Sequence, residues 1–560
     1  MKTFTKQIIM MCLMTSIAHI GLAQCHSWLN LSSPNPPLTA SLNGAWSITT
    51  DQNNNVYSSG GFTGSVSFGS TTLTNPTGGS SFYINKFNSS GILQWAIQLP
   101  VTTYKWPPVI CQKNGILYVA GAFANAVEMG SNTITTLSGY YAIFILKLDL
   151  NGNILCQGYT TEFGGTGNTR AYAAGITVNS LNEIYLTGRV DGNFSFGSTV
   201  LKSPVGSYAF LAKFDSDLNT IWAIQANSTT LNPNSRGFGI TLDNNQNVVI
   251  GGYFTQNIMF GAQSFNANNN LGSVNPYIAK FDKDGICQWI RGGAGPQKPI
   301  DFSGIGPVYT VVTDKSGNIY YTASLDSILV IDGNTLNAAN GVFYYCKYTP
   351  TGNLVWVHQA GNSSSPSNEA PTSLVIDGSE NMWSSGWIAG PASFGGYLLS
   401  HWGVFIAKLD LDGNFHGVIG GIGIDGNYSS ALDTDGNLYI GSAGTSDTIS
   451  FDGNTFININ DTSGVDLVLK YCTSEMGIEQ LSNNDNQVSV FPNPTTGKFT
   501  ITFPISTKQI QISNSLGQVI QTLYVDNEKS KDFELSVNGI YLIQLKTDKL
   551  TLSAKLVICK

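Results

Sequence analysis

The sequence predicts an all-β protein: a seven-bladed β-propeller followed by a small Ig-like β-sandwich. Three observations predict this fold class. A block of 61 to 67 residues recurs along the chain, each copy alternates short apolar strands with turn residues, and residues 488–560 follow a different strand pattern. The propeller is expected over residues 24–472 and the second domain over residues 488–560, with a polar linker at 473–487.

The composition suits exposed β-structure. Of 560 residues, 42% are hydrophobic, which is enough for sizeable cores, and only 11% are charged. Uncharged polar residues and 61 glycines supply the surface and the turns instead. The net charge of −8, with no basic patch among aromatic residues, argues against binding of nucleic acid.

Residues 1–23 have the organisation of a signal peptide. Lys2 and Lys6 give a positive start, Ile8 to Leu22 is mostly apolar, and a small-residue cleavage site ends at Ala23. We therefore expect export to the periplasm and, because no later run reaches about 18 apolar residues, no transmembrane segment. Leu22 to Cys25 resembles a lipobox, but the glutamine before the cysteine fits lipidation poorly.

A ten-residue pattern, Asp-x-x-x-Asn-x-Tyr-x-x-Gly, is the main signal in the repeat. Its register begins at Asp51, Gln112, Asn179, Asp243, Asp314, Asp377 and Asp433, and its last position is a small residue in every copy. A second block, apolar-x-small-Lys-apolar-Asp, follows each time, with these lysines: Lys86, Lys147, Lys213, Lys280, Lys347, Lys408 and Lys470. Seven copies at fixed offsets predict seven blades.

Each copy reads as several short strands joined by tight turns. Asp149 to Gly152 and Asp410 to Gly413 suit type I turns closed by a glycine bulge. A four-stranded sheet of this size cannot bury both of its faces alone. Radial stacking buries both faces and leaves only short edges, which is the β-propeller arrangement.

The N-terminal segment is expected to close the ring. A tryptophan stands nine residues after four of the repeated lysines, but the equivalent position after Lys470 is Glu479. Trp28 lies 23 residues before Asp51, within the range of 21 to 25 found between tryptophan and aspartate inside the repeat. We expect the segment around Trp28 to supply the last strand of the seventh blade.

One disulfide is predicted from the hairpin register. A bulged turn from Asp282 to Gly285 sets Asp282 opposite Ile286, and the equivalent positions in the closed seventh blade are Cys472 and Cys25. We expect these two cysteines to form a disulfide across the closure, which export makes possible. The alternative is a pair of buried free thiols.

Residues 488–560 carry a set of short motifs between alternating apolar residues, which indicates a small β-sandwich. Phe491-Pro-Asn-Pro-Thr-Thr-Gly497 is followed by a Leu-Gly-Gln at Gly517, a Gly-Ile-Tyr at Gly539 and a lysine near the end. The positions that carry this pattern are Phe491, Pro492, Asn493, Pro494, Gly497, Gly517, Gly539, Tyr541 and Lys555.

These motifs resemble the type A C-terminal sorting domain of type IX secretion. The resemblance implies recognition by the type IX secretion machinery and a sortase-like peptidase. It further implies release or attachment at the outer cell surface. Cys559 departs from the pattern. The upstream repeats resemble seven-bladed propeller repeats of secreted proteins, a resemblance that implies a fold and no fixed activity.

No catalytic, cofactor or metal site is recognised in the sequence. The four histidines outside the signal peptide, His26, His358, His401 and His416, have no metal-ligand spacing. Turns such as Asp410 to Asn414 resemble calcium loops but lack the later glutamate. The repeated lysines could ring the channel for an anionic ligand, but recurrence in every copy favours a structural pairing with aspartate or a backbone carbonyl. We expect no cofactor.

Three functions fit this sequence. The first is a binding or adhesion protein that displays loops to a glycan or protein ligand. The second is a polysaccharide lyase or hydrolase on a propeller scaffold, and the third a structural matrix protein. Aromatic residues outside the repeat could line a glycan-binding surface, although blade packing is the simpler interpretation: Tyr104, Trp106, Trp387, Tyr397 and Trp402.

Overall fold

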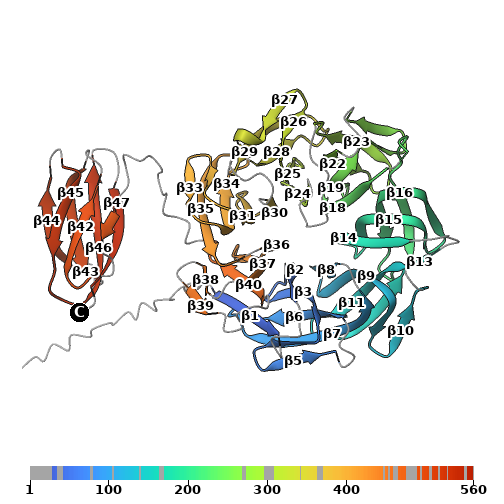
Figure 1. Ribbon diagram of the computed structural model, residues 1–560, viewed down its shortest axis with the longest axis horizontal. Coiled ribbons are helices and arrows are strands. Elements are labelled where there is room, and N and C mark those ends of the chain that lie inside the picture. Colours follow the sequence, from blue (N-terminus) through green and yellow to red (C-terminus); the bar gives the residue numbers. More distant parts are fainter. Residues whose placement is uncertain are drawn as a thin grey trace, which may run out of the picture.

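The computed structural model shows a ring of β-sheets and a separate β-domain, and the described elements are strands apart from one short 3-10 turn (Figure 1). The residues that it describes are 28–34, 42–75, 80–103, 106–137, 140–162, 169–231, 233–267, 273–295, 308–340, 342–361, 370–424, 426–444, 448–451, 454–457, 465–473, 489–491, 495–503, 507–514, 518–525, 528–547 and 551–558.

Every repeat folds into an antiparallel four-stranded path with the same order. The first three repeats contain β2 (Leu42–Thr50), β3 (Val56–Thr63), β6 (Ser80–Phe87) and β7 (Leu93–Thr103); β8 (Val109–Lys113), β9 (Ile116–Met129), β11 (Tyr141–Asp149) and β12 (Ile154–Tyr159); and β14 (Arg170–Val178), β15 (Ile184–Phe196), β16 (Thr199–Phe214) and β17 (Thr220–Gln225). The fourth and fifth contain β18 (Ser235–Leu242), β19 (Val248–Thr255), β22 (Val274–Phe281) and β23 (Cys287–Gly292); and β24 (Thr310–Thr313), β25 (Ile319–Ser324), β28 (Phe343–Tyr348) and β29 (Leu354–Ala360). The last two contain β30 (Ala370–Ile376), β31 (Met382–Ile388), β34 (Gly403–Leu409) and β35 (Phe415–Ile422); and β36 (Gly426–Leu432), β37 (Leu438–Gly444) and β40 (Val465–Tyr471) with β1 (Trp28–Pro34). The first strand of each path faces the centre of the ring (Figure 1).

Short hairpins extend the paths at the outside of the ring. They are β4 (Ser65–Phe68) with β5 (Thr71–Thr74), β20 (Asn257–Phe260) with β21 (Gln263–Asn266), β26 (Ile328–Ile331) with β27 (Asn334–Asn337), β32 (Ala392–Phe394) with β33 (Tyr397–Leu399), and β38 (Thr448–Phe451) with β39 (Asn454–Ile457). In addition, β10 (Asn132–Thr135) pairs with β9, β13 (Thr161–Glu162) pairs with β15, and a 3-10 turn spans Ala338–Asn340.

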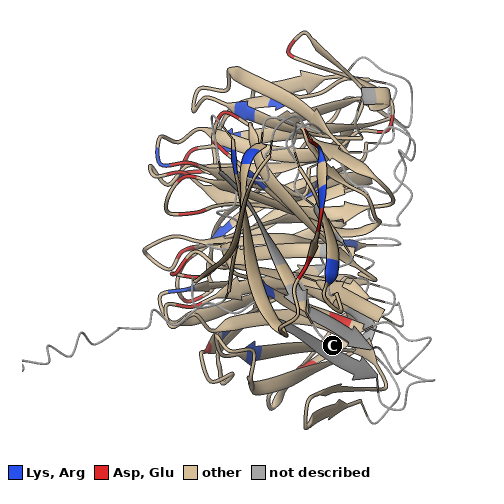
Figure 2. Cartoon of the chain, turned by 90° about the vertical axis from the view of Figure 1, so that its left-hand side faces the viewer, with Lys and Arg blue, Asp and Glu red and all other residues tan. Residues whose placement is uncertain are grey.

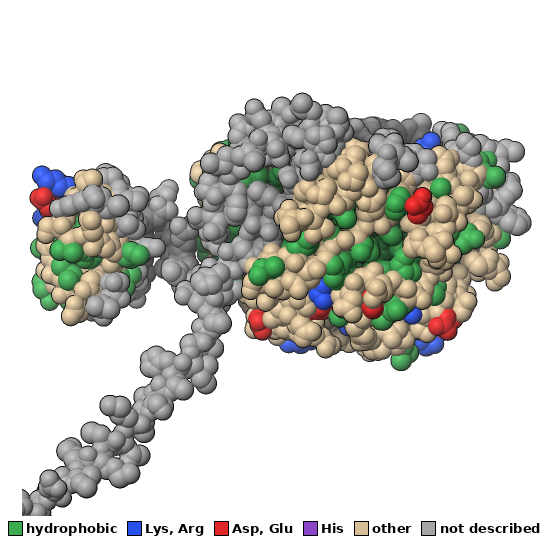
Figure 3. Space-filling view, turned by 90° about the horizontal axis from the view of Figure 1, so that it is seen from below, with side chains coloured by type: hydrophobic (Ala, Val, Ile, Leu, Met, Phe, Trp, Pro, Cys, Tyr) green, Lys and Arg blue, Asp and Glu red, His purple; other side chains and the backbone are tan. Residues whose placement is uncertain are grey.

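The hydrophobic cores lie between neighbouring sheets. One core joins Tyr185 and Leu211 of the third repeat to Ile250, Phe254 and Ala279 of the fourth. Each sheet is therefore covered on both faces by its neighbours, which is how a propeller buries sheets that are too small to fold alone. The outer surface carries mostly uncharged side chains with scattered charges (Figure 3), in agreement with the 11% charged share of the sequence.

The N-terminal strand pairs with the last repeat. β1 runs antiparallel to β40 with Trp28 opposite Lys470, as Trp289 lies opposite Lys280 inside the fourth repeat. This is the strand pairing that the sequence predicts. The boundaries of the signal peptide and the linker stay predictions, because residues 1–27 and 474–488 lie outside the described residues.

The C-terminal domain consists of two sheets. β41 (Ser489–Phe491), β42 (Lys498–Thr502) and β45 (Ser530–Glu534) form one, and β44 (Val519–Tyr524), β43 (Thr507–Asn514), β46 (Gly539–Thr547) and β47 (Thr551–Ile558) form the other. Phe499, Ile512 and Ile543 share a buried core between them. A likeness to the Ig fold in particular stays a prediction. Among the described residues, no helix has the length and apolar character needed to span a membrane.

Candidate binding cleft between the fourth and fifth repeats

The repeated aspartates organise the turns that precede the second strand of a blade. Asp314 accepts backbone N–H groups of Ser316 and Asn318 through Oδ1, at 2.9 and 2.8 Å. Its Oδ2 accepts the Asn318 amide at 2.7 Å and the Tyr320 hydroxyl at 2.9 Å. Burial and this hydrogen bond raise the pKa of Tyr320 well above its usual value. The aspartate, asparagine and tyrosine of the repeat thus form one closed structural network.

The repeated lysines act as clamps between neighbouring blades. The Lys347 ammonium donates to the carbonyl oxygen of Leu411 at 3.0 Å, and the Trp356 indole donates to the same oxygen at 3.3 Å. Lys86 with Trp95 contacts Leu150, and Lys280 with Trp289 contacts Pro350, in the same way. These bonds confirm the structural interpretation of these lysines. Charged residues gather in the loops along one side of the chain (Figure 2).

The calcium-like turns are explained by their own hydrogen bonds. Asp410 accepts the backbone N–H groups of Asp412 and Asn414, each at 2.9 Å, and also contacts Nε2 of His416 at 3.0 Å. Burial raises the pKa of Asp410, but the bonds from Asn414 and the turn outweigh it and hold this pKa below its usual range. Within the described residues, no group of three His, Cys, Asp or Glu side chains is placed to hold a metal.

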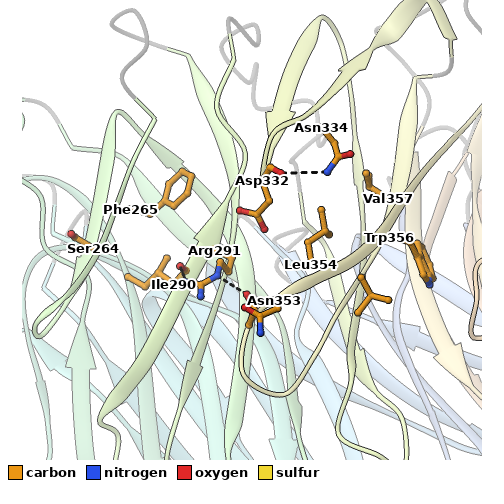
Figure 4. A pocket seen from close by; sticks show the side chains of 12 residues that line it. Ser264, Phe265, Ile290, Arg291, Asp332, Asn334, Asn353, Leu354, Trp356 and Val357 are labelled. Atoms are coloured by element: carbon orange, nitrogen blue, oxygen red, sulfur yellow. Dashed lines mark hydrogen bonds between the residues drawn. The ribbon is translucent and has the colours of Figure 1, made fainter.

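A cleft of about 830 Å³ opens between the outer strands of the fourth and fifth repeats (Figure 4). Phe265 of β21 and Arg291 of β23 form one wall, and Leu354 and Trp356 of β29 form the other. Its remaining lining residues are Ser264, Ile290, Asp332, Asn334, Gly352, Asn353, Val355 and Val357. The cleft is therefore lined by two particular repeats, and Arg291 stands where other repeats have Ile97, Ile224 and His358.

The polar groups of the cleft are held in place by the backbone. The Arg291 guanidinium donates to the Gly352 carbonyl through Nε at 2.6 Å and to the Ile290 carbonyl through Nη1 at 2.9 Å. It also lies over the Trp289 ring, 5.6 Å from its centroid. Asp332 lies at the β26–β27 turn with a φ of 45°, and Asn334 donates to its carbonyl at 3.4 Å. Figure 4 shows Arg291 and Asp332 facing the same space.

This arrangement suits recognition of a ligand with both polar and apolar faces. Phe265 and the exposed Val355 offer apolar contact, while Arg291, Asp332 and Asn334 offer one cation, one anion and an amide. Binding sites commonly combine an apolar lining with a few fixed polar groups. Asp332 is the one carboxylate among the described lining residues, whereas glycoside hydrolysis usually uses a pair.

The structure describes part of the predicted sorting motif. Gly497 is buried with a φ of 131°, and its N–H donates to Thr495 Oγ1 at 3.1 Å. The Tyr541 hydroxyl donates to the Val537 carbonyl at 2.9 Å, and Gly539 begins β46. Phe491 ends β41, and the backbone of Lys555 pairs with Leu542. Pro492, Asn493, Pro494 and Gly517 lie outside the described residues.

The cysteines fall into two groups. Cys111, Cys156, Cys287 and Cys346 are free thiols. Cys472 is fully buried and is disulfide-bonded. Its predicted partner, Cys25, lies outside the described residues, so the pairing stays a prediction.

The aromatic residues outside the repeat lie on more than one repeat. Trp106 and Trp387 are half-buried on different repeats, Tyr397 lies in β33, and Trp402 is 39% exposed. Tyr104 lies outside the described residues. None of the four described ones belongs to the cleft lining. The sequence did not point to the lining residues Phe265, Arg291 and Asp332 as candidate site residues. The one signal in the sequence concerns Arg291, because the chain has only four arginines.

Comparisons with known proteins agree with this division of the chain. Residues 489–559 match the family described as "Secretion system C-terminal sorting domain", which confirms the resemblance seen in the motifs and supports secretion of the chain. No curated protein matches the sequence.

Solved structures that resemble the chain are distant. They include the WD40 β-propeller domain of Doa1 (11% identity, 80% of this chain and 97% of that one, TM-score 0.33) and the periplasmic gluconolactonase PpgL of Pseudomonas aeruginosa (11%, 74% and 99%, 0.30). A protein of unknown function from Bacteroides caccae is also similar (10%, 53% and 78%, 0.30). At these TM-scores the likenesses carry no argument about activity.

Proposed function

We propose that this protein is a cell-surface or secreted propeller that binds a glycan or peptide ligand in the cleft between the fourth and fifth repeats. The observation that carries the proposal is a cleft with a non-repeated arginine in its wall. Arg291 stands where other repeats have Ile97, Ile224 and His358, and with Asp332 and Phe265 it lines a space of about 830 Å³. The regular residues of the repeat are, in contrast, occupied by the turn networks and clamps.

Phe265→Ala tests this site because the chain offers a matched control. Phe265 in β21 and Leu73 in β5 occupy the same hairpin position, since Gln263 pairs with Phe260 as Thr71 pairs with Phe68. Ligands are first found on an array of oligosaccharides and peptides, and affinities are then measured by calorimetry. We expect Phe265→Ala to weaken binding about tenfold or more, as for loss of an aromatic anchor. Leu73→Ala should leave it unchanged, and equal effects of the two variants would contradict the proposal.

Asp332→Asn separates binding from catalysis. The change removes one charge from the cleft with little change in shape, so we expect weaker binding of a ligand that donates hydrogen bonds or carries positive charge. The alternative function, a polysaccharide lyase or hydrolase, predicts that new chain ends accumulate with time when a bound glycan is incubated with the protein. It also predicts that a point variant abolishes them.

We further propose that the C-terminal domain directs type IX export after a signal peptide has carried the chain to the periplasm. The family match at residues 489–559 supports the sorting role. Deletion of residues 488–560 should leave the protein in the periplasm, while the full chain should reach the medium or the cell surface. Fractionation with an antibody to the propeller distinguishes these outcomes, and surface display of the truncated chain would disprove the role.

We also infer that the ring has seven blades and that Cys25 and Cys472 lock its closure. The four described free thiols leave Cys12, Cys25 and Cys559 as partners for the disulfide of Cys472. Cys25 fits best, because Asp282 and Ile286 occupy the equivalent positions and join through Asp282 N and the Ile286 carbonyl at 3.0 Å. Peptide mapping without reduction should recover a Cys25–Cys472 peptide; recovery of both as free thiols would refute the pairing.

A further inference from the structure

Side chains of non-neighbouring repeats meet across the centre of the ring. Trp106 immediately precedes the inner strands of the second repeat, and Arg236 lies in β18 of the fourth. The Arg236 guanidinium carbon is nevertheless 5.1 Å from the centroid of the Trp106 ring. Inner strands of non-neighbouring blades face one another only across the centre (Figure 1), so this contact places both residues at the axis.

The contact extends across the ring as a continuous cluster. Trp46 of the first repeat packs on Trp106 with ring centroids 5.4 Å apart, and stacks on Tyr428 of the last repeat at 4.9 Å. On the other side, Arg236 lies 4.4 Å from the centroid of Phe238. We call Trp46, Trp106, Arg236, Phe238 and Tyr428 the axial cluster. Its four aromatic side chains are half-buried, so they also face solvent.

Arg236 has no acidic partner in this cluster. Its residue is only 6% exposed, yet its Nε–H has no hydrogen-bond partner, and no ion pair joins it to a described carboxylate. Its described close neighbours include two aromatic rings, which offer no hydrogen-bond acceptor oxygen to the N–H donors of the guanidinium. A buried cation without a partner is costly, because its lost hydration is not replaced.

The surroundings add positive charge. The chain has four arginines. Arg170 and Arg236 lie on β14 and β18, the inner strands of the third and fourth repeats, and Arg189 lies on the adjacent β15. Arg189 is paired with Asp191 at 2.6 Å, but the buried Nε of Arg170 also has no partner. Burial, together with the nearby Arg189, lowers the pKa of Arg236 to about 10, so it still carries its charge at neutral pH.

We propose that the axial cluster binds a carboxylate-bearing ring compound, with the carboxylate on Arg236 and the apolar ring face on Trp46 and Trp106. A planar guanidinium suits a carboxylate, which accepts two parallel N–H bonds. Tryptophan faces suit the C–H face of a sugar or an aromatic ring. Uronic acid residues of an acidic glycan and aromatic carboxylates share this chemistry. The site is separate from the cleft, since no member of the cluster lines it.

The test measures calorimetric affinity of the full chain for three probes: a galacturonate oligosaccharide, benzoate, and a neutral glucose oligosaccharide of matched length. Arg236→Met removes the guanidinium while keeping an apolar chain, and Arg236→Lys keeps the charge without the paired donors. Lys315→Met is the charge-matched control, because Lys315 is exposed and its ammonium bonds only the Gly378 carbonyl, at 2.8 Å.

We expect Arg236→Met to weaken binding of a carboxylate probe by about 10- to 100-fold, the range for loss of a charged hydrogen bond. Arg236→Lys should give an intermediate loss of affinity. Lys315→Met should bind the carboxylate probes as tightly as the native chain, and the neutral probe should not bind. If only the galacturonate oligosaccharide binds, the carboxylate belongs to an acidic glycan. If only benzoate binds, it belongs to an aromatic carboxylate.

Two results overturn the proposal. One is that neither carboxylate probe binds the native protein. The other is that a probe binds Arg236→Met or Arg236→Lys as tightly as the native chain, which assigns Arg236 a packing role. Melting curves guard against misfolding: removal of an unpaired buried cation should leave the melting temperature unchanged or raise it. Phe265→Ala, which alters only the cleft, should leave carboxylate binding at the axial cluster intact. The proposal for the cleft and the proposal for the axial cluster can therefore fail independently.

Discussion

At the residue scale, the aspartate–lysine network adjusts in the fourth repeat, which lacks the tyrosine. Tyr57 and Tyr439 donate to their aspartates, but the fourth repeat has Val249 at this position. There Lys280 pairs directly with Asp243 at 2.8 Å, with both side chains less than 5% exposed. The buried carboxylate thus keeps a partner in each of these repeats, although the residue that supplies it differs.

This pair gives a direct prediction. Lys280→Met should destabilise folding by about 3–5 kcal/mol, because it leaves Asp243 buried without its cation. Lys315→Met, an exposed lysine near the same turn, should change stability by less than about 0.5 kcal/mol. Urea unfolding followed by tryptophan fluorescence measures both, and a similar loss in the two variants would contradict the assignment.

The aspartates of the turns also predict a response to acid. Burial raises the pKa of Asp243 and Asp377, but bonds from Lys280 and Asn247 in the first, and from Trp383 and Asn381 in the second, outweigh it and hold both pKa values below the usual range. Since the folded pKa is depressed, the stabilisation is present above the unfolded carboxyl pKa of about 4 and is lost as the pH falls below it.

Melting temperatures between about pH 7 and pH 3 check this expectation. The curve should be flat at the upper end and fall steeply below about pH 4. Asp377→Asn should lower stability at neutral pH and flatten the acid slope. A melting temperature that stays constant to about pH 3 would show that these carboxylates contribute nothing through titration.

The sequence predicted the residues that repeat and missed those that do not. Lys347 and Trp356 recur, so their structural role follows from their recurrence. Arg236 and Arg291 have no arginine counterpart in the other repeats, and their importance depends on which distant side chains the ring brings to them. Trp106 was recognised as an outlier from the repeat, but its partner Arg236 sits 130 residues away in the sequence.

At the scale of the strand, the small residue three places after the aromatic one is explained by close backbone packing. A Cβ at Gly188 would stand 1.9 Å from the Tyr172 carbonyl oxygen, and one at Gly252 the same distance from the Arg236 carbonyl. The neighbouring inner strand has a bulge next to each contact. The sequence therefore predicted that the position must be small, and the structure shows that the adjacent strand is the cause.

Gly188→Ala should destabilise the protein by about 1–3 kcal/mol, the usual cost of overpacking, because the Tyr172 carbonyl cannot move without breaking the sheet. Ser442→Ala is the matched control at the same position of the last repeat, where the buried hydroxyl has no hydrogen-bond partner and its loss should be neutral. Thermal unfolding of the two variants decides the matter; a neutral Gly188→Ala would mean that the inner strand tolerates displacement.

At the scale of the whole molecule, the last and first repeats are joined by the same kind of contact as neighbouring repeats inside the ring. The Lys470 ammonium donates to the Ser89 carbonyl at 3.2 Å, the same clamp that Lys86 makes on Leu150. Thr50 adds a bond to the Leu432 carbonyl at 2.6 Å. Closure was predictable because the Trp28 segment copies the internal spacing, whereas the cleft was not, because it depends on the outer hairpins of two repeats.

Closure by a strand from the other end of the chain makes the ring depend on β1. Deleting Trp28–Pro34 from the full chain leaves one edge of β40 unpaired, and an open edge strand is a site for aggregation. We expect amide exchange to accelerate first in β40, β37 and β36 and last in the fourth repeat, opposite the gap. Deleting residues 488–560 should leave exchange in the ring unchanged. Uniform acceleration around the ring would instead mean that the blades unfold as one unit and that β1 holds all of them equally.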